Sequence, residues 1–65
     1  MDYYVLIVWR GVQPKLHGPY KTLQQRDQKA KKLRNDFGVT ASLFPIEVST
    51  GSEISINFYP ADFFE

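Results

Sequence analysis

The sequence predicts an α+β fold with the element order β-α-β-β, in which one helix packs on a three- or four-stranded, mainly antiparallel sheet. Three observations support this fold class. Residues 3–9 are a run of β-branched and aromatic residues, which is typical of a strand. Residues 22–38 carry the start and stop signals of a helix, and residues 39–59 contain two strand-like segments joined by a Ser-Thr-Gly-Ser turn. The chain has 65 residues and no linker, so we expect one domain over residues 1–65.

The first strand is apolar on both faces. Alternation along the strand puts Tyr3, Val5, Ile7 and Trp9 on one face and Tyr4, Leu6, Val8 and Arg10 on the other. This pattern is typical of a central strand that is covered on both sides. Because one helix covers only one side of a sheet, the other side is expected to meet the C-terminal tail, a partner or a second copy of the chain.

The helix has a defined beginning and end. Residues 11–20 are turn-like, with a short returning strand around Leu16 as an open alternative, and the Gly-Pro-Tyr corner at 18–20 is expected to swing the chain off the sheet. Thr22 and Gln25 then fit a capping box, and Gly38 stands where a left-handed residue ends a helix. At 100° per residue the buried stripe consists of Leu23, Ala30, Leu33 and Phe37. Arg26 and Arg34 lie near this stripe, and we expect each to pair with Asp27, Asp36 or a strand carboxylate.

Residues 39–48 and 53–59 are expected to form the last two strands. Pro45 removes one backbone donor, which indicates an edge position or a bulge. The final strand alternates, and its apolar residues Ile54, Ile56 and Phe58 are expected to point inward. Pro60 stops this strand. In the tail, Phe63 and Phe64 either cover the open face of the first strand or form a contact for a partner.

Charge is divided unevenly along the chain. Residues 1–34 hold all eight Lys and Arg against two Asp, a net charge of +6, whereas residues 35–65 hold five carboxylates and no Lys or Arg, a net charge of −5. Such a division predicts a dipolar surface, and it bears on partners rather than on fold.

Composition argues against most enzyme classes. The chain has no Cys and a single His, so it lacks a thiolate nucleophile and the usual zinc ligands. No Walker loop, nucleophile elbow or catalytic carboxylate pair is evident. We therefore expect no enzyme activity, no cofactor and no metal site. The apolar run near the N-terminus is too short for a membrane span and has no basic segment before it, which favours a cytoplasmic location without membrane contact.

The acidic half of the chain is the first candidate for partner binding. Its carboxylates are expected to gather at one edge of the sheet beside exposed aromatic residues, as a surface made of Asp36, Glu47, Glu53, Asp62, Glu65, Tyr59 and Phe63. Carboxylates arranged in this way occupy a basic groove by presenting negative charge where phosphates would otherwise lie. The alternative is an acidic edge that only discourages strand-to-strand aggregation.

The basic face of the helix is the second candidate. Lys21, Lys29, Lys31 and Lys32 lie away from the predicted buried stripe and are suited to phosphate contacts with a nucleic acid. The alternative is a solvated face that serves helix propensity and solubility.

Two resemblances extend this interpretation. The stretch Gly-Pro-Tyr-Lys-Thr followed by a helix, over residues 18–33, resembles the strand-to-helix corner of the peptidoglycan-binding SPOR domains, although their second helix has no counterpart here. As a minute, cysteine-free single domain with divided charge, the chain also resembles in type the small inhibitors encoded by phages and mobile elements, including anti-CRISPR proteins. The −5 charge of residues 35–65 and the absence of catalytic motifs, together with that resemblance, favour a non-catalytic inhibitor that binds a host nucleic-acid-handling complex through the acidic surface. The alternatives are a nucleic-acid binder that uses the basic helix, and a structural or assembly subunit that dimerises through Tyr4, Leu6 and Val8.

Overall fold

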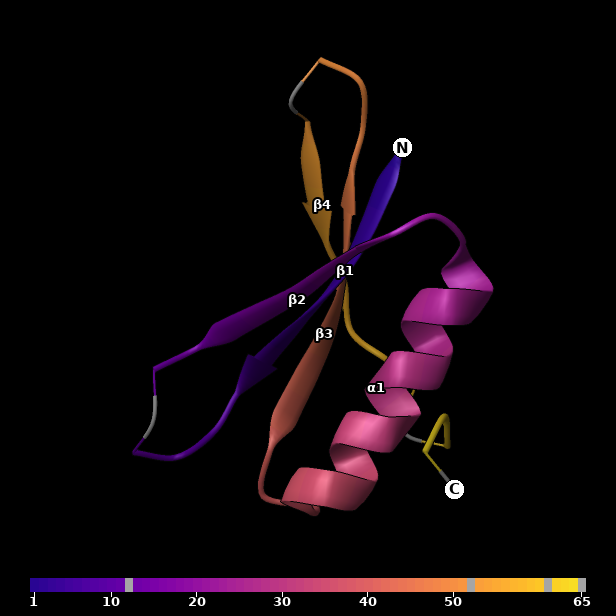
Figure 1. Ribbon diagram of the computed structural model, residues 1–65. Helices are drawn as coiled ribbons and strands as arrows, with labels where there is room; N and C mark the ends of the chain where they lie inside the picture. The colour runs from indigo at the N-terminus through magenta and orange to yellow at the C-terminus, as the bar shows by residue number, and fades with distance from the viewer. Residues whose placement is uncertain (12, 52, 61, 65) are drawn as a thin grey trace.

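The computed structural model describes residues 1–11, 13–51, 53–60 and 62–64. In these residues the elements are β1 (Asp2–Val8), β2 (Lys15–Tyr20), α1 (Leu23–Phe37), β3 (Ser42–Val48) and β4 (Ile54–Ile56), as Figure 1 shows. The strands form one sheet in the order β2-β1-β3-β4, and every neighbouring pair is antiparallel. The predicted α+β class, with one helix on a four-stranded antiparallel sheet, is confirmed. The returning strand around Leu16 forms as β2, so a hairpin precedes the helix.

The helix covers one face of the sheet. In the antiparallel registers Val5 stands opposite Pro45 and His17, and Ile7 stands opposite Leu43, so these side chains share a face. The core lies between this face and α1, and its buried residues are Val5, Ile7, Ala30, Leu33, Ala41 and Leu43. The strand predicted to be central is therefore central, with β2 on one side and β3 on the other.

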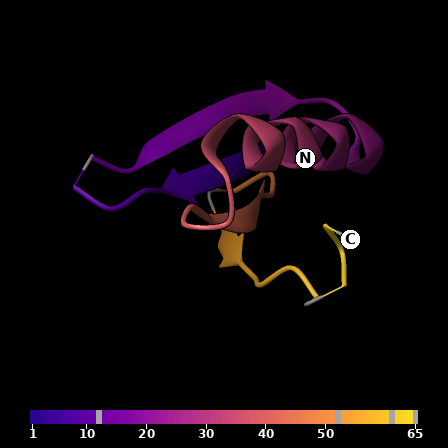
Figure 2. The same ribbon diagram turned by 90° about the horizontal axis from the view of Figure 1, so that it is seen from below.

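The C-terminal tail lies on the same side of the sheet as the helix (Figure 2). Tyr59, Phe63 and Phe64 are half-buried and pack against the core beside α1. The expected burial of the two phenylalanines is thus partly correct, but they do not cover the open face of β1. That face, which carries Tyr4 and Leu6, is not covered by any described segment of the chain.

The helix begins and ends as predicted. The hydroxyl of Thr22 accepts a hydrogen bond from the backbone N–H of Gln25 at 3.1 Å, and the side chain of Gln25 accepts one from the N–H of Lys21 at 3.3 Å. At the other end Gly38 has φ 79° and donates its N–H to the carbonyl of Arg34 at 2.8 Å.

The buried stripe of the helix differs from the prediction at one position. Its buried residues are Arg26, Ala30 and Leu33, whereas Leu23 is 46% exposed. The prediction for Leu23 was wrong because the helix meets the sheet one turn later, where the Arg26 guanidinium faces the ring of Tyr3 and the carboxylate of Glu47.

The Gly-Pro-Tyr segment belongs to β2 and is not a turn that leaves the sheet, which corrects the prediction. Tyr20 pairs with Tyr3 and His17 pairs with Val5, so Gly18 and Pro19 together oppose one residue and form a bulge. Gly18 has φ +142°, and a Cβ at this position would lie 2.7 Å from Cδ2 of Tyr4 and 2.9 Å from the carbonyl oxygen of Tyr3. Only glycine fits, because both the backbone angle and the space exclude a side chain.

The last two strands are shorter than predicted, and the final strand turns its predicted inward residues to the opposite face. β4 pairs with Ile46–Val48, so β3 is paired on both sides there, whereas no described strand pairs with its outer edge over residues 42–44, which we call the free edge. Pro45 lies where this free edge begins, and its carbonyl accepts the N–H of Asn57 at 3.1 Å. Ser55 stands opposite Glu47 on the helix side, which turns Ile54 and Ile56 to the other face. The expectation that these two residues and Phe58 point into the core was therefore wrong; they are 63%, 60% and 82% exposed.

We predict that Gly18→Ala lowers the free energy of unfolding by about 2 kcal/mol or more, because the new methyl group meets Tyr4 and the backbone of β1. Gly51→Ala is the matched control. Gly51 also has a positive φ, +105°, but nothing lies within 4 Å of an added Cβ. We therefore expect Gly51→Ala to lower the free energy of unfolding by only about 1 kcal/mol. Urea unfolding at a fixed protein concentration measures both. Equal losses in the two variants would show that the close approach at Gly18 is not a constraint.

Candidate functional site

A buried guanidinium lies at the centre of the polar contacts. Nε of Arg26 donates to Oδ1 of Asp27 at 3.1 Å, and its Nη1 lies 3.5 Å from Oε1 of Glu47 as an ion pair without hydrogen-bond alignment. The guanidinium also lies over the ring of Tyr3, 5.5 Å from its centroid. The Arg26 side chain is only 7% exposed, so these partners offset the cost of removing its charge from water. The prediction that Arg26 pairs with Asp27 or a strand carboxylate is confirmed on both counts.

The predicted acidic surface is not brought together as one patch. Glu47 is half-buried and paired with Arg26, while Glu53 is exposed beside the β3–β4 turn and Asp36 is exposed in the last turn of α1. The β3–β4 turn and the last turn of α1 lie at opposite ends of the molecule in Figure 1. Asp62 is exposed in the tail, and Glu65 lies outside the described residues. Partner binding by this set of residues stays a prediction.

The two aromatic residues of that predicted surface contribute to the fold. The hydroxyl of Tyr59 donates to Oδ1 of Asp27 at 3.2 Å, and its ring stacks on Phe63 at a centroid distance of 4.4 Å. Burial, followed by the negative charge of Asp27, raises the pKa of Tyr59 well above its usual value. Phe63 in turn lies under Nζ of Lys31, which is 4.9 Å from the ring centroid.

The helix lysines separate onto two flanks. Lys29 and Lys32 line a hollow of about 450 Å³ with Tyr20 and two glutamines, on the side of α1 that faces β2, and we name this set the basic groove (Tyr20, Gln25, Gln28, Lys29, Lys32). Burial, followed by the charges of Lys29 and Lys15, lowers the pKa of His17 in β2 below its usual value. Lys31 lies on the other flank over Phe63, and Lys21 is exposed just before the helix. The structure thus divides the predicted basic face and adds Tyr20 to it.

A third surface, which sequence reasoning identified only in part, is the helix-free side of the sheet. Register places alternate residues of all four strands on this side, with Asp2 and Ser42 as its polar members. We name the apolar members the apolar sheet face: Tyr4, Leu6, Val8, Leu16, Phe44, Ile46, Val48, Ile54 and Ile56. Ile46 in the middle of this face is only 6% exposed, whereas Leu16 and Ile54 toward its margins are 55% and 63% exposed. Phe58 extends this face, because its ring packs edge-on against Phe44 at 5.7 Å. The alternation of residues 3–8 indicated the β1 part of this face, but not the contribution of β4.

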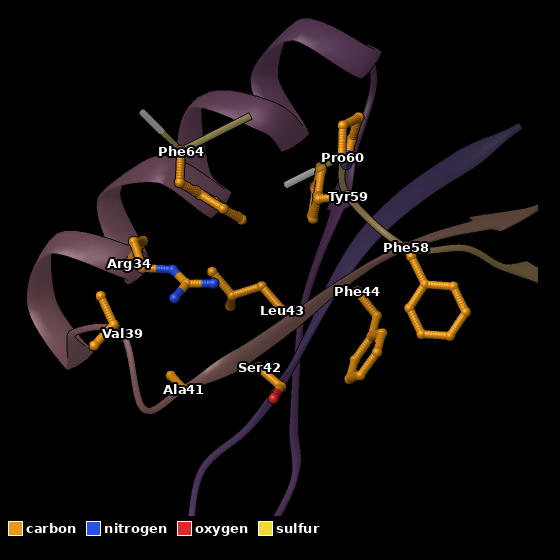
Figure 3. A pocket seen from close by; sticks show the side chains of 10 residues that line it. All are labelled: Arg34, Val39, Ala41, Ser42, Leu43, Phe44, Phe58, Tyr59, Pro60 and Phe64. Atoms are coloured by element: carbon orange, nitrogen blue, oxygen red, sulfur yellow. The ribbon is translucent and has the colours of Figure 1, made fainter. Parts of the chain in front are cut away.

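Arg34 reaches into a cleft of about 410 Å³ beside the free edge of β3, as Figure 3 shows. The cleft is bounded by α1, the start of β3, the segment after β4, and Phe64. The guanidinium carbon of Arg34 lies 4.4 Å from the centroid of the Phe64 ring. Within the described part of the chain no carboxylate lies within ion-pair distance of Arg34, so its predicted pairing with Asp36 or a strand carboxylate is not observed there.

Comparisons with protein-family models, with curated proteins and with solved structures found no match. Among the described residues no group of three His, Asp or Glu side chains is placed to hold a metal ion. The one helix that these residues form is too short and too polar to cross a membrane. The fold and its surfaces therefore carry the functional argument.

We predict that Glu47→Gln lowers the free energy of unfolding by about 1–2 kcal/mol, because the buried Arg26 loses one of its two carboxylates. The Glu47 side chain is 33% exposed, which limits the effect. Glu53→Gln is the matched control, because Glu53 is an exposed residue of the same hairpin. We expect it to change the free energy of unfolding by less than about 0.5 kcal/mol. Urea unfolding compares the two, and a loss no larger for Glu47→Gln than for Glu53→Gln would contradict the role of the Arg26–Glu47 pair.

Proposed function

We propose that this chain is a non-catalytic protein-interaction module that works as a dimer, with two copies joined through their apolar sheet faces. The observation that carries the proposal is a sheet face of apolar residues that no described segment of the chain covers, with Leu16, Ile54 and Ile56 each more than half exposed. A contiguous apolar surface of this kind is uncommon on a monomer and marks a site of association. The described strands place no Lys, Arg or Glu on this face, and Asp2 lies at its margin opposite Val48.

A dimer through this face would have to bury a sizeable share of the molecule. The accessible surface of the described chain is 4796 Å², and a standard interface buries about 800 Å² per partner, or about one sixth of that total. At 65 residues the chain also buries a smaller share of its surface than a larger domain does, so a second layer adds core that one copy lacks.

A second copy is the occupant that matches this face best. The face is almost uncharged, so a strongly charged partner would find no group to pair with, whereas an identical face is equally apolar. Two sheets packed face to face lie about 10 Å apart with interdigitated side chains. In that arrangement both helices remain on the outside, with their lysines in solvent. This extends the predicted dimerisation through Tyr4, Leu6 and Val8 to the whole sheet face.

We predict that the wild-type chain elutes as a dimer in size-exclusion chromatography with light scattering, and that Ile56→Asp elutes as a folded monomer. The aspartate would place a charge on the β4 part of the proposed dimer interface without entering the core beneath the helix. Leu23→Asp is the control, since Leu23 is also exposed and apolar but lies on α1, away from the sheet face. A wild-type chain that stays monomeric at high micromolar concentration would overturn the proposal.

The basic groove supports a second candidate function, the binding of single-stranded nucleic acid. Lys29 and Lys32 of α1 line one hollow with the half-buried Tyr20 of β2, and an aromatic ring beside cations is suited to stacking a base while the lysines contact phosphates. The inhibitor hypothesis makes the opposite claim about nucleic acid. In it Glu53 and Asp62, which are exposed, present negative charge to a host complex, and the chain itself has no affinity for nucleic acid.

One gel-shift experiment separates these two candidates. If the groove binds, a mixed-sequence single-stranded oligonucleotide shifts at low salt, the shift weakens at physiological salt, and Lys29→Gln with Lys32→Gln weakens it about tenfold. Lys31→Gln is the control, because Lys31 lies over Phe63 on the other flank of the helix. The absence of any shift at low salt would rule out the groove and agree with the acidic inhibitor. That hypothesis fails in turn if reversing Glu53 and Asp62 to Lys leaves a partner complex unaffected.

A further inference from the structure

The cleft beside β3 exists because the chain leaves the sheet early. The β3–β4 register continues as far as the hydrogen bond from Asn57 to the carbonyl of Pro45, and in that register Tyr59 would stand opposite Leu43. The described residues show no backbone hydrogen bond between Tyr59 and Leu43. Pro60 follows, and Figure 3 shows the segment from Phe58 to Pro60 diverging from β3. The space between them is the cleft of about 410 Å³, which falls within the range of small-ligand sites.

The backbone of Leu43 faces this space. Along a strand the N–H and C=O of alternate residues point to the same edge, and the carbonyl of Pro45 points to the β4 side, where Asn57 binds it. The N–H and C=O of Leu43 therefore point to that side as well, into the part of the edge that β4 does not reach. They offer one donor and one acceptor to whatever occupies the cleft.

Arg34 supplies the charge. Its Nε is buried and has no hydrogen-bond partner among the described residues, and Figure 3 shows the guanidinium pointing into the space between Val39, Leu43 and Phe64. The contact with the Phe64 ring holds the guanidinium plane in place. A fixed planar fork with open N–H groups in apolar surroundings is suited to bidentate binding of a carboxylate.

We propose that this cleft binds an apolar carboxylate, with the carboxylate on Arg34 and its aliphatic or aromatic part among Val39, Leu43 and Phe64. Apart from Arg34, Ser42 and Tyr59, the side chains that line the cleft are apolar. The described residues place only one cation in it, which fits a monoanion better than a phosphate dianion. Two sources supply this chemistry, a free carboxylic acid and the C-terminal residue of a peptide. A peptide would also use the N–H and C=O of Leu43, as an added strand does at a sheet edge.

Titration followed by backbone and arginine Nε–H NMR signals tests the site. The probes are N-acetyl-phenylalanine, its amide, and 3-phenylpropanoate. We expect both carboxylates to shift the Arg34 Nε–H signal, and the amide to bind at least about tenfold more weakly because it lacks the charge. A shift of the Leu43 N–H with N-acetyl-phenylalanine alone identifies a peptide C-terminus as the ligand, and equal behaviour of the two acids identifies a free acid. Phenyl phosphate that binds more tightly than either carboxylate would overturn the proposal.

Variants make the assignment specific. Arg34→Met keeps the apolar contact with Phe64 but should lose the preference for the acid over the amide, whereas Arg10→Met, which removes an exposed arginine elsewhere, should keep it. The Ile56→Asp variant separates this site from dimerisation, since a monomer should bind the probes as the wild type does. No saturable shift in the wild type, or the same acid preference in Arg34→Met, would overturn the site.

Discussion

The structure depends on one buried charge. Arg26 lies between the helix and the sheet with only 7% of its side chain exposed, and a guanidinium in that place needs partners on every side. Asp27 supplies one from the helix, Glu47 one from β3, and the Tyr3 ring one from β1. Asp27 also accepts the hydroxyl of Tyr59, which joins the C-terminal segment to the same group. One side chain therefore links three parts of the chain that are far apart in sequence.

The open face of the sheet follows from the same contact. Because Glu47 must face the helix to reach Arg26, its neighbour Ser55 in β4 faces the helix too, and strand alternation turns Ile54 and Ile56 outward. The aromatic tail is held on the helix side by Tyr59 and by the contacts of Phe63 and Phe64 with helix cations. The helix and the C-terminal tail thus cover the same face of the sheet. In the proposed dimer, the apolar sheet face of a second copy covers the other face.

The candidate binding surfaces also depend on which residues the fold uses. Surfaces that were expected from charge along the chain, such as the acidic half and the helix lysines, are separated in space because some of their members serve the fold: Glu47 pairs with Arg26, and Lys31 lies over Phe63. The Arg34 cleft had no signal in the sequence beyond an arginine near a predicted buried stripe. It forms because β4 ends before it reaches Leu43, and the length of a strand pairing is decided by contacts that no local pattern records.

Local features were predictable wherever neighbouring residues decide them. The helix begins at the Thr22 cap and ends at Gly38 because those hydrogen bonds close within one turn, and β1 is a strand because β-branched and aromatic residues favour extended backbone. Which face each residue occupies was decided by partners distant in the chain. Leu23 is exposed and Arg26 is buried because Arg26 pairs with Glu47 on β3. Gly18 must be a glycine because Tyr4 and the backbone of Tyr3 fill the space beside it. Composition and short-range hydrogen bonding thus established the helix with its ends and the central strand, whereas the face that each element turns to the core required the long-range contact between a buried cation and its carboxylates.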